Sequence, residues 1–210
     1  MKFLVQVQYW ESRLGRKEHP LQYIDPVEEP ILNFMQVHIG VPLAYSSAFT
    51  IEEGTDKYQL AKAFKALLVA FYKDYDAATL EYMTKGLLAR YELEAVLKPK
   101  QLLQNAKAWF KFLEKFGNIH QIHRKVPLQY FYQQRRFETI VDFMIETEQQ
   151  LILIQNSGLS GPKNRWKDKA MELASWFYLC KEAVSVHYPQ KRISCYVHLV
   201  LQGAVIEVNF

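Results

Sequence analysis

The 210-residue sequence is poor in several features that would place it in a specialised class. It has no apolar run near the roughly 20 residues that a transmembrane helix needs. We read no signal peptide at its start, because the segment lacks both a hydrophobic core and a small-residue cleavage site. Only two cysteines occur, Cys180 and Cys195, which excludes a disulfide-rich scaffold. We therefore expect a cytoplasmic globular domain, in which two buried free thiols are favoured over a disulfide.

Several motifs that carry chemistry are also missing. A Gly-x-x-x-x-Gly-Lys-Ser/Thr loop is absent, which excludes ATP hydrolysis through a P-loop. Ser157 stands in Asn-Ser-Gly rather than in Gly-x-Ser-x-Gly, so a serine-hydrolase elbow is excluded. The spacing of His120, His123, His187 and His198 fits no tetrahedral zinc motif, and the cysteines do not complete one. We expect these histidines to be ordinary surface or core residues.

The composition is that of one well-packed domain. Half of the residues are hydrophobic and 14% are aromatic, and a chain of this length suits a single core. The formal net charge is +4, and the sequence pI is about 8.9. This mildly basic balance permits contact with a polyanion without requiring it.

Hydrophobic periodicity divides the chain into an arm, a helical region and a sheet region. Residues 1–53 predict an irregular N-terminal arm, with one strand at 2–10 followed by four prolines. The rest predicts helices at about 56–71, 77–93 and 99–117, strands at 119–132, 137–146 and 150–155, one long helix at 163–186, and strands at 192–201 and 205–210. We expect an α/β fold, with a mixed central sheet at about 118–210 flanked by helices and a helical part at about 54–117.

Four short segments, in this order, resemble motifs of the RecB-like nuclease domains of the PD-(D/E)XK superfamily. The first, Gly54-Thr55-Asp56-Lys57-Tyr58, resembles the family's Gly-Thr-x-x-His, and the second, Phe137-Glu138-Thr139-Ile140-Val141-Asp142, resembles its Gly-x-x-Asp. The third, Leu153-Ile154-Gln155-Asn156-Ser157-Gly158, falls where the family has Ile-Asp-Tyr-Lys-Thr. The fourth, Glu172-Leu173-Ala174-Ser175-Trp176, falls where the family has Gln-x-x-x-Tyr. The resemblance covers residues 54–210. It implies a restriction-endonuclease-like core, in which carboxylates on neighbouring strands hold Mg²⁺ or Mn²⁺ and a lysine orients the attacking water.

The sequence departs from these motifs where that chemistry takes place. Asp142 alone matches a functional position. The other positions are occupied by Tyr58, Gln155, Ser157, Glu172 and Trp176. One carboxylate beside a neutral amide is a poor Mg²⁺ site, and the missing lysine removes a positive charge where negative charge develops. The resemblance therefore implies a domain without catalytic residues, bound metal or cofactor. If any metal ligand remains, it is Asp142.

Two other hypotheses remain open. Glu138, Asp142 and Glu146 are spaced by four residues and share a strand face, so an active Mg²⁺- or Mn²⁺-dependent nuclease with a rebuilt site around Asp142 is one alternative. Glu148 and Glu172 are further acids for such a site. Alternatively, the acids are solvated or paired with nearby arginines, and the chain is a protein–protein scaffold without DNA binding.

Basic residues near the predicted long helix form a candidate DNA contact. A helix start flanked by bases and an aromatic side chain can hold phosphate and stack a base. The candidate residues are Arg135, Arg136, Arg165, Trp166, Lys167 and Lys169. The alternative to DNA contact is that these residues lie at a solvated helix end. The resemblance implies that such a domain acts in DNA processing, repair or recombination, with DNA and a helicase domain or subunit as partners.

Overall fold

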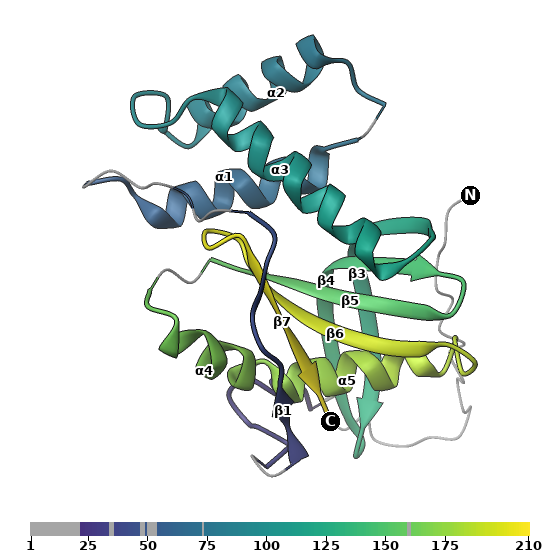
Figure 1. Cartoon of the computed structure of the whole chain (residues 1–210). Helices are drawn as coiled ribbons and strands as arrows, with labels where there is room; N and C mark the ends of the chain where they lie inside the picture. The colour runs from purple at the N-terminus through teal and green to yellow at the C-terminus, as the bar shows by residue number, and fades with distance from the viewer. Residues whose placement is uncertain (1–21, 34–35, 47–48, 50–53, 73, 159–160) are drawn as a thin grey trace, which may run out of the picture.

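A computed structural model describes residues 22–33, 36–46, 49, 54–72, 74–158 and 161–210 (Figure 1). The chain is an α/β protein with a mixed seven-stranded sheet between two layers of helices. The helices are α1 (Lys57–Ala70), α2 (Ala77–Arg90), α3 (Pro99–Leu113), α4 (Asn164–Glu172) and α5 (Ala174–Ser185), with a 3₁₀ turn η2 at Glu114–Phe116. The strands are β1 (His38–Ile39), β2 (Leu43–Ala44), β3 (Ile119–Tyr132), β4 (Arg135–Thr147), β5 (Gln150–Ser157), β6 (Arg192–Leu199) and β7 (Ala204–Asn209).

The sheet follows the order β1-β7-β6-β5-β4-β3, and β2 also pairs with β7. All pairs are antiparallel except β5 with β6, which the α4–α5 crossover joins in parallel. Gly203, at φ +60°, lies in the turn between β6 and β7, as the sequence predicts for a hairpin there. The sequence thus predicts the mixed sheet with flanking helices correctly.

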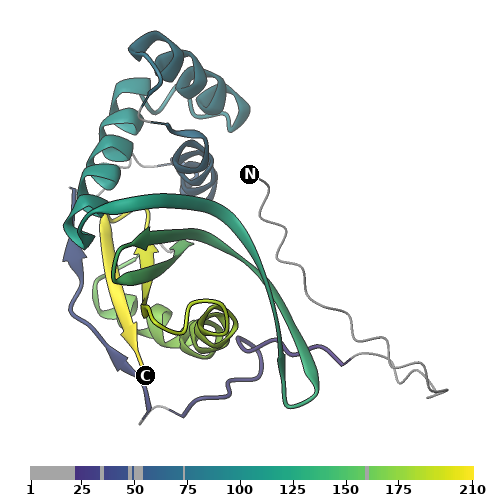
Figure 2. The same cartoon turned by 90° about the vertical axis from the view of Figure 1, so that its right-hand side faces the viewer.

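Two cores hold the layers together. The upper core lies between α1–α3 and the sheet, and the lower core lies between α4–α5 and the sheet (Figures 1 and 2). In β5, Ile152 and Ile154 face the upper core, whereas Leu151 and Leu153 face the lower core. A strand covered on both faces needs this continuous apolar run. Strand β5 pairs with β4 on one side and with β6 on the other.

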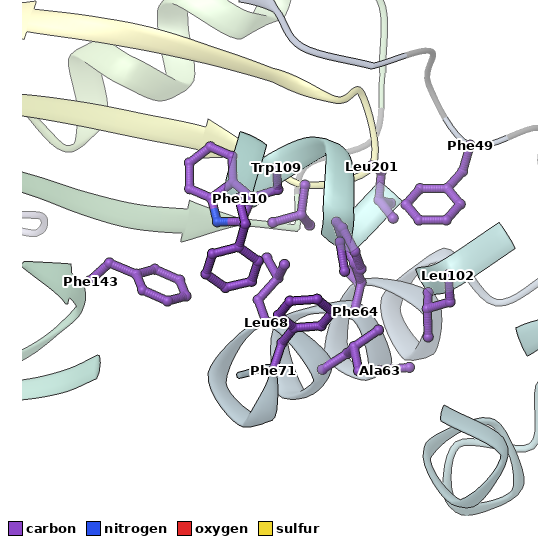
Figure 3. Close-up of a cluster of buried hydrophobic side chains, with 14 of the residues drawn as sticks. Phe49, Ala63, Phe64, Leu68, Phe71, Leu102, Trp109, Phe110, Phe143 and Leu201 are labelled. Atoms are coloured by element: carbon purple, nitrogen blue, oxygen red, sulfur yellow. The ribbon is translucent and has the colours of Figure 1, made fainter. Parts of the chain in front are cut away.

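Aromatic side chains fill much of the upper core (Figure 3). Phe71 of the α1 C-cap stacks on Phe110 of α3 at a centroid distance of 4.9 Å, and Phe49 meets Phe64 edge-on at 5.1 Å. Each fully buried aromatic or leucine contributes about 1.5–3 kcal/mol by leaving water. The helical region is therefore fastened to the sheet rather than separate from it.

The helix predicted at 163–186 is two helices rather than one. The chain turns at Leu173 (φ −89°, ψ −1°), so α4 ends at Glu172 and α5 begins at Ala174. Before this turn α4 contacts β1 and β7, and after it α5 contacts β3, β5, β6 and β7. Because the sheet is twisted and the β3–β4 hairpin curls, one straight helix could not follow both surfaces. The apolar period across the turn does not reveal this bend.

Part of the predicted arm joins the sheet. Strands β1 and β2 both pair with β7, and Tyr23 forms a parallel bridge with Arg136. The Ser175 hydroxyl on α5 accepts hydrogen bonds from the Ile31 and Leu32 N–H groups, at 2.9 and 3.1 Å. The strand predicted at 2–10 lies outside the described residues.

The β3–β4 hairpin bends around α5 (Figure 2) and changes its buried face midway. Phe137 and Val141 face the lower core, whereas Phe143 faces the upper core. Residues of equal parity share one face of a regular strand, so the alternation breaks between Val141 and Phe143, at Asp142. Opposite on β3, Lys125 has a φ of +52°, which is uncommon outside glycine. The candidate site lies at this break.

Candidate functional site

The site begins where β4 separates from β5. Their backbone ladder ends at the pair Phe143 and Ile154, although β5 continues beside β6 to Ser157. At the next position, Asp142 and Gln155, a bond between backbone and side chain takes the place of the backbone hydrogen bonds. The Asp142 N–H donates to Gln155 Oε1 at 3.2 Å. The motif positions Asp142 and Gln155 are therefore neighbours across the fork between the two strands.

Asp142 is a buried acid whose carboxylate contacts protein groups. Its side chain accepts the Asn156 N–H at Oδ2, at 2.8 Å, and the residue is only 4% exposed. The other oxygen pairs with Lys125 Nζ. The left-handed backbone of Lys125 lies at the same break of the hairpin. Asp142 thus joins β3, β4 and β5 at the point where the hairpin changes face.

The acids considered for a rebuilt metal site have separate basic partners. Glu138 pairs with Arg136, as the ordinary alternative predicts for an acid near the arginines. Glu146 pairs with Lys191 at 2.6 Å, and this hydrogen bond lowers the pKa of its carboxyl. Within the described part of the chain, no group of three histidine, cysteine, aspartate or glutamate side chains is arranged to hold a metal ion.

A pocket of about 320 Å³ opens beside this fork, between α1, the end of β5 and α4. We call it the α1–α4 pocket. It is lined by Tyr58, Ala61, Lys62, Lys65, Ser157, Gly158 and Lys169. It contains Tyr58 and Ser157, two residues of the segments that resemble the RecB-like motifs, and three lysines. An anion would find several ammonium donors here.

Lys65 is one of the three lysines that line the pocket. It is half-buried, and its Nζ lies 3.7 Å from the position that a Cβ on Gly158 would take. Burial lowers the pKa of its ammonium, the neighbouring Asp142 charge raises it, and Lys125 and Lys169 lower it again. Among the described residues Lys65 has no hydrogen-bond or ion-pair partner. A charge held in this way is ready for an external anion.

The other two lysines of the pocket have weaker local contacts. Lys62 Nζ lies 4.0 Å from the centroid of the Tyr58 ring, and that ring is 63% exposed. Lys169 pairs with Glu172 at 2.6 Å, both on α4. Glu172, at the motif's glutamine position, therefore lies next to the pocket without lining it.

A buried polar chain lies behind the fork. His198 Nδ1–H donates to Asn156 Oδ1 at 2.7 Å, and its Nε2 accepts the Tyr45 hydroxyl at 2.8 Å. The imidazole stacks on Trp109 with centroids 3.8 Å apart. Burial holds the pKa of His198 well below its usual value, so the ring is neutral. As the sequence predicts, this histidine is a satisfied core residue, and it braces Asn156 beneath Asp142.

The six candidate DNA contacts lie on two elements. Arg135 and Arg136 begin β4 at the hairpin turn, whereas Arg165, Trp166, Lys167 and Lys169 lie on α4. Arg135 pairs with Glu29 at 2.8 Å. Arg165 and Lys167 are exposed on α4. Of the six predicted contacts, only Lys169 lines the α1–α4 pocket.

Trp166, a predicted DNA contact, and Trp176, in the segment that resembles the Gln-x-x-x-Tyr motif, both lie in the lower core. Trp166 is 8% exposed and donates its indole N–H to the Gly161 carbonyl at 3.2 Å, so it offers little surface for stacking a base. Its apolar ring is more stable under the sheet than at the helix surface. Trp176, at the motif's tyrosine position, donates to the Thr139 hydroxyl at 2.9 Å.

Sequence reasoning misses Lys62 and Lys65 as site residues. Their signal is helical spacing, because Tyr58, Lys62 and Lys65 follow one another at i, i+4 and i+7 and so share one face of α1. Lys125 carries no such signal, since its contact with Asp142 depends on the bend of the hairpin.

No protein-family model matches the sequence, and a search of curated proteins finds no match either. Among the described residues, no helix combines the length and apolar character that a transmembrane span requires.

Proposed function

We propose that this chain is a RecB-like nuclease-fold domain without nuclease activity, which binds the backbone of DNA within a DNA-processing machine. The observation that carries the proposal is the neighbouring placement of Asp142 and Gln155 where β4 and β5 separate. The metal of a PD-(D/E)XK nuclease would require a second carboxylate at this position. A neutral amide that is already hydrogen-bonded to the strand cannot supply it.

The cationic surroundings support binding over cutting. The α1–α4 pocket adjoins this fork and is lined by three lysines. Lysine ammonium groups attract phosphate as point charges, but among the described residues no group of acids is arranged beside them to hold a metal that would activate a water. We therefore expect affinity for a phosphate backbone without hydrolysis.

The experiment is fluorescence anisotropy of an end-labelled DNA fork, titrated with the protein in Mn²⁺ at two salt concentrations. The expected result is a rise that weakens steeply as salt increases and stays constant over time. A parallel titration in EDTA should give the same curve, because the proposed contact needs no metal.

Two results would contradict the proposal. A rise that decays below the free-DNA value, only with Mn²⁺, would indicate an active nuclease whose site is rebuilt around Asp142. An Asp142→Ala variant should then lose the cutting. No rise at either salt concentration would remove the DNA role altogether.

A helicase-bracing role has its own observation. Phe131 of β3 and Ile140 of β4 are exposed by 51% and 54%, and both lie on the projecting β3–β4 hairpin. Exposed apolar side chains of this kind suit a protein partner such as a helicase domain. Replacing both with threonine should leave DNA binding unchanged and weaken co-purification with the cognate helicase. Unchanged co-purification would exclude this surface.

A further inference from the structure

The charges around the α1–α4 pocket do not balance. Lys169 has Glu172 as its partner, and Lys125 has Asp142. Lys65 is half-buried and forms no close ion pair among the described residues, because the nearby Asp142 carboxylate already pairs with Lys125. An unpaired ammonium that loses part of its hydration costs folding free energy, so its retention in a pocket indicates a compensating anion.

The donors in the pocket favour phosphate over carboxylate. Lys62, Lys65 and Lys169 approach from two helices, α1 and α4, and each is a compact charge with rotatable donors. Planar carboxylates are usually recognised by the fork of an arginine, and the pocket lining contains none. A tetrahedral phosphate can accept from several ammonium groups at once.

The aromatic residue at the rim indicates a nucleotide rather than a free ion. The Tyr58 ring is 63% exposed and lies on the same face of α1 as Lys62 and Lys65. Proteins that bind single strands combine cationic grooves with aromatic rings on which bases stack. A phosphate in the pocket would place the attached sugar and base near this ring.

We propose that the α1–α4 pocket binds one phosphate group of a nucleic-acid strand, with lysine ammonium groups in the role that divalent cations have in a metal-dependent nuclease. Lys65 is the central donor, and Lys62 and Lys169 flank it. The neighbouring base stacks on the face of the Tyr58 ring opposite the Lys62 ammonium. This assignment rests on the proposed DNA role, because it names the contact through which the strand is held.

The decisive variant is Lys65→Met, which keeps the length of the side chain and removes its charge. The matched control is Lys85→Gln, because Lys85 is an exposed lysine on α2, which does not line the pocket. Each protein is titrated with inorganic phosphate by calorimetry, and with a labelled single-stranded oligonucleotide by anisotropy. Oligonucleotides with a 5′-phosphate and with a 5′-hydroxyl distinguish a terminal phosphate from a backbone phosphate.

We expect phosphate to bind the wild type and Lys85→Gln, and to show no measurable heat with Lys65→Met. The oligonucleotide should bind Lys65→Met about tenfold or more weakly, because a charge-assisted contact is lost. The slope of log affinity against log salt should fall by about 0.7 for the lost contact. Without phosphate, Lys65→Met should unfold at a higher temperature than the wild type, since the variant no longer buries an unpaired charge. A merely structural lysine would give the opposite shift.

The outcomes separate the pocket from the broader DNA role. Equal binding of phosphate by Lys65→Met and the wild type would overturn the pocket assignment. If the oligonucleotide also binds both equally, the DNA role stands and its contact lies elsewhere. If phosphate binds only the wild type and no oligonucleotide binds, the pocket is a phosphate site and the DNA role fails.

Discussion

Asp142 offers the sharpest test of how the fork between β4 and β5 is held. In an Asp142→Ala variant the buried Asn156 N–H loses its acceptor, which costs about 1–3 kcal/mol. The ion pair with Lys125 is also lost, but that lysine side chain is 50% exposed, so solvent screening reduces this contribution to below about 1 kcal/mol. We expect a total loss of about 3 kcal/mol.

The matched variant is Asp142→Asn, which keeps an oxygen facing the Asn156 N–H and loses only the charge. Its cost should therefore be about 1 kcal/mol. Urea denaturation of the wild type and both variants measures the difference directly, provided that the slope of unfolding free energy against urea is unchanged. The alanine variant should be less stable than the asparagine variant by about 2 kcal/mol.

Two results would refute this reasoning. Equal costs for the two variants would mean that the accepted N–H is unimportant and that Asp142 acts through its charge alone. An alanine variant more stable than the wild type would mean that the acid is retained at a cost to folding, as for a metal ligand or catalytic group. The rebuilt nuclease would then become the better hypothesis.

Three further predictions follow from buried groups and from one turn. The pKa of His198 is lower in the folded chain than its ordinary 6.5, so the unfolded chain binds more protons at acidic pH. The free energy of unfolding should therefore fall by about 1.4 kcal/mol for each pH unit below pH 6.5. Urea titrations at several pH values measure this dependence, which a His198→Gln variant should lack. Burial raises the pKa of Cys195 to about 12 and that of Cys180 well above its usual value. Both thiols should therefore react with a thiol reagent only after the protein is unfolded in urea. Rapid reaction of either thiol in the native protein would show that it is accessible. The hairpin turn at Gln133 and Gln134 has φ values of +49° and +64°, so replacing the pair with Asn-Gly should raise the free energy of unfolding by about 1 kcal/mol in urea titrations. No gain would mean that the turn has another conformation.

Much of the secondary structure can be predicted from the sequence because local chemistry and tertiary packing agree. The Asp56 side chain caps α1 by accepting from two backbone N–H groups, and Pro99 stands in the first turn of α3. The strand predicted at 119–132 has the bounds of β3, and the β4–β5 turn falls at the predicted position. In these segments the apolar period and the end signals indicate the same element.

The features that the sequence does not predict depend on distant partners. Strands β1 and β2 have two residues each and form because β7 presents a free edge, so no local pattern indicates them. The turn at Leu173 follows the twist of the sheet. The contact of Lys125 with Asp142 requires a left-handed residue in the middle of a strand. Such features arise from packing and are invisible to periodicity.

The same limit explains why the motifs locate the fork but not the lysines around it. Asp142 and Gln155 lie on neighbouring strands whose register is fixed by alternating core residues, so motif spacing is enough to bring them together. Lys62, Lys65 and Lys169 converge only because α1 and α4 approach the end of β5 from two sides. Their convergence is a property of the packed layers.

Under the proposed function, the neutral Gln155 and the lysines near it have the same electrostatic effect. In a metal-dependent site, two carboxylates repel a phosphate until a divalent cation reverses the local charge. In the described part of this chain Gln155 is neutral, and the Asp142 carboxylate lies near two lysines, Lys65 and Lys125, so the local charge is positive without any ion. The proposal therefore predicts that the site attracts phosphate at any metal concentration and does not activate a water for attack. Binding in EDTA without any cleavage in Mn²⁺ is the behaviour that distinguishes this arrangement from a weakened enzyme.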